Sequence, residues 1–129
     1  GPDMLGMLAG NITRLQDSFM EKLYADLETI DADLSSKLTL RLNDQALLSV
    51  AGEHPDREAI QSLLCLHPEF SAALTEIATQ SVALRNLRSL RALASSASSA
   101  SGYAVLSSRP GENAYQVSLK GDMNHFYWR

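Results

Sequence analysis

Three histidines and a single cysteine are the residues of this 129-residue chain that could ligate a metal or act as a nucleophile. His54 and His67 both stand in a His-Pro-acid sequence, directly before a predicted helix start. A histidine in front of a helix does not form the three- or four-residue ligand pair of a helical metal site. Each is therefore interpreted as a helix-start residue, and His125, which lies among aromatic residues, as a surface side chain.

Cys65 lies among three leucines, at 63, 64 and 66, and is predicted to be buried and unreactive. A lone cysteine excludes an intramolecular disulfide and a cysteine-built zinc site. The chain has no Gly-x-Ser-x-Gly nucleophile motif, and its seven glycines are too scattered for a phosphate-binding loop. The sequence therefore predicts no catalytic residue, no metal and no cofactor, and an enzyme would need a site assembled from distant residues.

Arg85, Arg88 and Arg91 form the most suggestive charge pattern, because a spacing of three residues places them along one slowly drifting ridge of a helix. Leucines at 84, 87, 90 and 93 run beside them at the same spacing. The arginines could contact phosphates or an acidic partner, or could simply stabilise the carboxyl end of the helix. An apolar ridge next to a basic ridge suits a protein interface better than DNA.

Phe126, Tyr127 and Trp128 place three of the chain's eight aromatic residues at adjacent positions near the end of the sequence. Adjacent residues of a strand point to opposite faces, so at least one of the three should be exposed. Such a cluster is typical of binding hot spots, while packing of Phe126 and Trp128 against the core is the structural alternative. The predicted partner-binding residues are accordingly these three aromatics and the three ridge arginines.

These candidates must be positioned by helices and strands that the apolar spacing outlines. A helical period predicts a long central helix over 68–93, a first helix over 12–30 capped by Asn11, and a short helix over 55–66. Alternation with period two predicts a β-hairpin over 37–51. A second hairpin is predicted from strands at 103–107 and 114–120, followed by 123–129 as a third strand or an aromatic tail.

The Ser/Ala segment 94–102 has two interpretations, a flexible linker or an extension of the central helix. Residues 1–10 are interpreted as a tag remnant, Gly1-Pro2, and an N-terminal lead, with a single domain over 11–129. The predicted fold class is α+β, with about three helices packed on an antiparallel sheet of two hairpins.

Composition limits the function classes. Hydrophobic residues at 45% and charged residues at 20% are typical of a globular domain, and a net charge of −4 argues against a general binder of nucleic acids or anionic membranes. No apolar run is long enough to span a membrane, and a cytoplasmic location is expected unless a targeting segment has been removed.

The sequence as a whole favours a non-enzymatic protein–protein interaction module, such as a small bacterial adaptor, inhibitor, chaperone or regulatory domain. Its expected partner is another protein, with self-association through the central helix left open. A nucleic-acid-binding regulator that uses the arginine ridge is the alternative, and a small enzyme ranks third.

Overall fold

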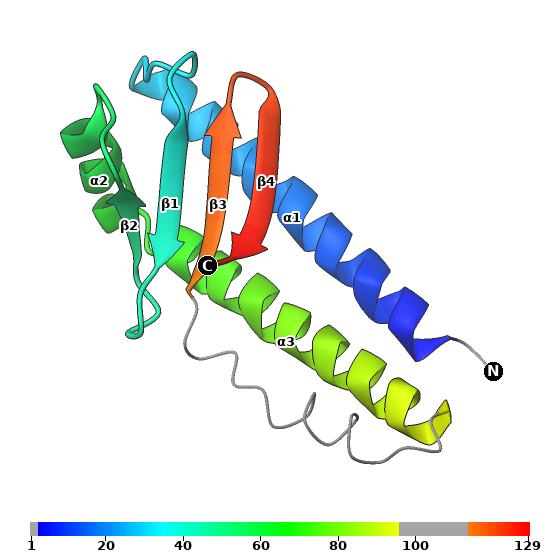
Figure 1. Ribbon diagram of the computed structural model, residues 1–129. Helices are drawn as coiled ribbons and strands as arrows, with labels where there is room; N and C mark the ends of the chain where they lie inside the picture. The colour runs from blue at the N-terminus through cyan, green and yellow to red at the C-terminus, as the bar shows by residue number, and fades with distance from the viewer. Residues whose placement is uncertain (1–2, 96–113) are drawn as a thin grey trace.

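Three helices lie on one face of a four-stranded antiparallel sheet in the computed structural model, which describes residues 3–95 and 114–129 (Figure 1). This arrangement confirms the predicted α+β class. The elements, in chain order, are α1 Met4–Thr29, β1 Leu38–Leu42, β2 Leu48–Ala51, α2 Arg57–Leu66, α3 Glu69–Ser95, β3 Tyr115–Lys120 and β4 Met123–Trp128. Within the described ranges, no helix is both long enough and apolar enough to cross a membrane.

The two long helices, α1 and α3, run antiparallel to each other behind the sheet (Figure 1). Lys22 pairs with Glu69 at 3.1 Å near the start of α3, and Asp3 pairs with Arg91 at 3.3 Å near its end. The sheet covers only one part of this pair, so the beginning of α1 and the end of α3 project beyond it as a two-helix arm.

The first helix begins earlier than the sequence predicts. The Asp3 carboxylate, and not Asn11, caps it by accepting a hydrogen bond from the amide of Leu5 at 3.1 Å. Asn11 lies inside the helix, and its side-chain amide donates to Gln80 of α3 at 2.6 Å. The predicted helix start at Asn11 is therefore wrong, because contact with α3 outweighs the weak helix propensity of the glycine-containing segment before it.

The core lies between the inner face of the sheet and the helices. Its fully enclosed side chains come from every layer of the fold, namely Leu23, Leu27, Leu40, Ile60, Leu74, Ile77 and Val117, all 0% exposed. Burying a side chain of this size stabilises a fold by about 1.5–3 kcal/mol. The apolar stripe that predicts the central helix is confirmed, since Leu74 and Ile77 both lie in this core.

The sheet has the strand order β2-β1-β3-β4 and is antiparallel throughout. The predicted hairpin over 37–51 is confirmed as β1 and β2. The third-strand interpretation of 123–129 is also confirmed, because β4 pairs with β3 across a turn at Gly121, whose φ of +61° favours glycine. The strand predicted over 103–107, and the choice between linker and helix for 96–102, lie outside the described residues.

Cys65 is exposed, which contradicts the prediction of burial. It stands in the last turn of α2, where Leu63 and Leu64 occupy the inward positions and Leu66 is 76% exposed. A run of leucines on a short helix contains more apolar residues than its single buried face can accept. The thiol therefore falls on the solvent side.

Candidate functional site

The sheet has one face against the helices and one face that no described helix covers (Figure 1). Side chains alternate between these faces along each strand. The register then aligns the uncovered positions in rows across the strands, such as Thr39, Ser118 and His125. We call this surface the open face.

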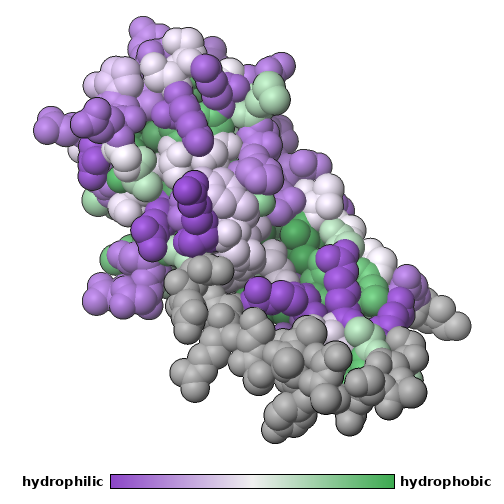
Figure 2. Space-filling view, in the orientation of Figure 1, coloured by the Kyte–Doolittle hydropathy of each residue, from purple (hydrophilic) through white to green (hydrophobic). Residues whose placement is uncertain are grey.

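The open face is cationic. Its positions within the four strands hold no Asp or Glu and carry Arg41 and Lys120. Lys37, directly before β1, and Arg129, directly after β4, extend the basic surface, while Glu53 lies beside Lys37 at the β2 end of the sheet. Figure 2 shows the sheet in pale and purple, hydrophilic shades, whereas green, hydrophobic patches gather over the projecting arm. Such a concentration of one sign attracts a partner of the other.

A hydrogen-bonded row of polar side chains runs across the middle of the open face. The Ser118 hydroxyl lies 2.9 Å from the Thr39 hydroxyl and 2.7 Å from that of Tyr127. The rings of His125 and Tyr127 stack, with centroids 5.0 Å apart and planes 18° apart. Because Ser118 is buried and bonded on both sides, these contacts fix the two rings as a rigid platform on β4.

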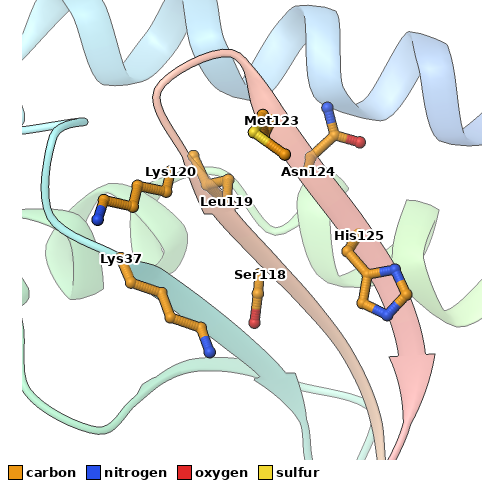
Figure 3. A pocket seen from close by; sticks show the side chains of 7 residues that line it. All are labelled: Lys37, Ser118, Leu119, Lys120, Met123, Asn124 and His125. Carbon is orange, nitrogen blue, oxygen red and sulfur yellow. The ribbon is translucent and has the colours of Figure 1, made fainter.

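A shallow pocket of about 260 Å³ opens beside this platform (Figure 3). Lys37 stands before β1, Ser118 and Lys120 belong to β3, and His125 comes from β4. Figure 3 shows these side chains standing on the same side of the strands. Leu119 and Met123 complete the lining, so the pocket surface is mainly apolar and the two ammonium groups and the imidazole are the groups that can contact a carboxylate, since the Ser118 hydroxyl is already bonded to Thr39 and Tyr127. These groups do not include a nucleophile with an adjacent base.

The three predicted aromatics divide between the two faces, as strand alternation requires. Phe126 and Trp128 pack against the core, with Phe126 6.0 Å from the ring of Phe19 and Trp128 4.9 Å from that of Tyr115. Tyr127 lies on the open face. Of the three, Tyr127 alone belongs to the candidate site.

The predicted arginine ridge lies away from the open face, on α3. Arg85 stacks over the Trp128 ring at 5.8 Å from its centroid, and Arg91 pairs with Asp3. Arg88 is exposed. Arg85 and Arg91 thus already make contacts within the molecule. Because the ridge lies on α3 and Tyr127 on the open face, the structure does not bring the ridge arginines and Tyr127 together in one site.

Two of the histidines have structural contacts at the helix starts. His54 is buried, its Nε2 lies 2.8 Å from the carbonyl oxygen of Asp33, and its Nδ1 accepts from the amide of Asp56 at 3.0 Å. This pair of bonds requires a neutral ring with its proton on Nε2. His67 contacts Glu69 at 3.1 Å.

Asp33 belongs to the same corner of the fold as His54. Its carboxylate accepts hydrogen bonds from the hydroxyl and amide of Ser35 and from the hydroxyl of Ser36, which together hold the pKa of this carboxyl below its ordinary value. The corner ties the segment before β1 to the start of α2. No group of three or more potential metal ligands occurs in the part of the chain that the structure describes.

Sequence reasoning missed Lys37, Arg41 and Lys120, because each is an isolated cation until the strands are paired. Each of these cations alternates in sequence with the buried apolar residues of its strand. This alternation was the signal that could have placed it on the outer face of the sheet. None of the protein-family models, curated proteins or solved structures compared with the chain matches it. The function is therefore argued from the site alone.

Proposed function

We propose that this protein is a non-enzymatic protein–protein interaction module that binds an acidic surface of its partner on the open face. The observation that carries the proposal is the set of four cations on this face, Arg41 and Lys120 within the strands and Lys37 and Arg129 at strand ends, where the strand positions themselves hold no Asp or Glu. The rigid platform of His125 and Tyr127 adds aromatic surface of the type enriched in binding hot spots.

A protein partner suits this surface better than a nucleic acid. Affinity for nucleic acid comes mainly from many phosphate contacts, whereas the chain is acidic overall and its arginine ridge is partly engaged by Trp128 and Asp3. Four cations on one face of a small domain are enough for charge complementarity with an acidic protein surface.

The proposal is tested by comparing two charge reversals of equal size. Lys120→Glu changes the open face and Arg88→Glu changes an exposed position on α3. In pull-downs from a nuclease-treated lysate of the source cells, a genuine partner should be lost with Lys120→Glu and retained with Arg88→Glu.

A labelled oligo-dT strand serves as the nucleic-acid probe in a parallel anisotropy titration. Binding of the oligonucleotide, combined with the absence of any protein sensitive to Lys120→Glu, would refute the proposal and favour the nucleic-acid alternative.

A further inference from the structure

The two edges of the sheet differ in how their backbone groups are paired. On the β2 edge, the outward amide of Leu48 donates to the Ser71 hydroxyl at 3.0 Å, and that of Val50 donates to the Gln61 side chain at 2.9 Å. Side chains from α3 and α2 thus occupy the donors that an added strand would need. The β2 edge is closed.

The β4 edge is open. Ala114 and Arg129 exchange two backbone hydrogen bonds, of 3.0 and 2.9 Å, next to the β3–β4 ladder. Since inward and outward pairs alternate in an antiparallel ladder, the amides and carbonyls of Asn124, Phe126 and Trp128 point away from β3. These three residues have no hydrogen bond through their outward backbone groups in the described part of the chain.

We propose that the partner of this module adds an extended segment to β4 as a fifth strand, and that this segment alternates acidic and apolar residues. This inference rests on the proposed function and specifies how the partner binds. An open strand edge supplies a fixed row of donors and acceptors that only another polypeptide strand can match.

The flanking side chains define the chemistry of the added strand. Its side chains on the open face would lie beside the His125 and Tyr127 platform and next to Arg129, where carboxylates are favoured. Its alternate side chains would lie next to the partly exposed rings of Phe126 and Trp128, where apolar groups are favoured.

A second copy of the chain is a poorer occupant of this edge. The β4 strand contains no Asp or Glu, so a second copy would bring no carboxylate to Arg129 or to the rest of the open face. An acidic strand therefore complements this edge better than a second copy does.

The matched variants Asn124→Pro and Asn124→Ala test strand addition. Proline removes the outward amide without touching the ladder to β3, and it is tolerated where an edge amide faces solvent. Alanine keeps that amide. The probe is the peptide fluorescein-Glu-Val-Glu-Val-Glu-Val-Glu-amide, labelled at its N-terminus, with fluorescein-Glu-Glu-Glu-Glu-Val-Val-Val-amide as its composition control. We expect the alternating peptide to bind more tightly, Asn124→Pro to weaken it about ten-fold or more, and Asn124→Ala to leave it within two-fold.

Hydrogen exchange on the unmodified protein gives an independent readout that does not depend on a variant folding. Binding of the alternating peptide should slow exchange of the Asn124, Phe126 and Trp128 amides about ten-fold or more. The amides of His125 and Tyr127, which already bond to β3, should change little.

Three results would overturn the inference. Equal binding of both peptides with loss on Lys120→Glu would leave the proposed function standing and refute strand addition. Unchanged exchange of the three outward amides in the bound state would refute it as well. Finally, sedimentation could show that the protein is a dimer without peptide, and exchange of the three outward amides could already be slow in that dimer. This result would identify a second copy as the strand that pairs with β4 and would refute the proposal of an acidic partner strand.

Discussion

Alanine substitutions along β4 should separate its two faces by their effect on stability. Phe126 and Trp128 pack against the core, whereas Tyr127 stands on the open face. Replacing a buried Phe or Trp by Ala costs about 3–5 kcal/mol. Both rings are only partly buried here, so we expect Phe126→Ala and Trp128→Ala each to lower the free energy of unfolding by about 2–3 kcal/mol.

Tyr127→Ala should be milder. It removes the hydroxyl that lies 2.7 Å from Ser118 and donates a long hydrogen bond, of 3.4 Å, to Gln116, but Ser118 keeps its bond to Thr39 at 2.9 Å and is not left unpaired. The loss of a typical hydrogen bond costs about 0.5–1.5 kcal/mol net, and the long bond to Gln116 adds little. Tyr127→Phe, which keeps the ring stacked on His125, is the matched control for the hydroxyl alone.

Urea unfolding followed by circular dichroism is the assay. With a slope of about 1.5 kcal/mol per molar urea, losses of about 2–3 kcal/mol should lower the midpoint by about 1.3–2 M, and a Tyr127→Ala loss of about 0.5–1.5 kcal/mol should lower it by about 0.3–1 M. If Tyr127→Ala were as costly as Phe126→Ala, or if Phe126→Ala cost less than about 1 kcal/mol, the assignment of faces would be wrong. Because two of the three aromatics support the fold, binding experiments should use Tyr127→Ala and not a triple substitution.

Further predictions concern the contacts around the sheet. A double-mutant cycle between Arg85 and Trp128 should give a coupling of about 0.5–1 kcal/mol, and no coupling would show that the stacked geometry is not energetically significant. His54→Ala should destabilise the fold by about 1–3 kcal/mol in urea unfolding, since it leaves a buried amide without its acceptor. The lowered pKa of Asp33 contributes stability that is present above the unfolded pKa of about 3.9 and is lost as the pH falls through the folded value; Asp33→Asn should flatten this acid limb in unfolding measured from pH 6 to 2. Cys65 should react with a thiol reagent in the native state as fast as in urea, and protection would contradict its exposure.

Periodicity in the sequence predicts the long elements of this fold and misses what depends on contacts between them. The stripe through Leu74 and Ile77 identifies α3, because one apolar face repeated over many turns has few alternative structures. The start of α1 could not be predicted, since the segment around Gly6 becomes helical with support from the distant α3. Cys65 was misplaced because four consecutive apolar residues do not reveal which of them face inward.

Only part of the candidate site could be predicted from the sequence, for a related reason. Successive side chains of one strand point to opposite faces, so Tyr127 must face away from Phe126 and Trp128. An exposed ring near the end of the chain could therefore be predicted. The cations beside it belong to other strands, and the register that brings Lys37 and Lys120 to the same pocket is set by strand pairing. A pairing between β1 and β3, separated by two helices in the chain, leaves no local signal in the sequence.

The contrast between the two sheet edges bears on why the open face is cationic. An uncovered edge strand is a hazard, because identical copies can pair along it and aggregate. Gln61 and Ser71 remove that hazard at β2 by occupying the outward amides, and no described side chain does so at β4. Because β4 has no Asp or Glu, a second copy gains no ion pair from Arg129 when it pairs along this edge, whereas an acidic segment does. The charge distribution therefore favours an acidic partner over a second copy at an edge whose backbone groups stay accessible.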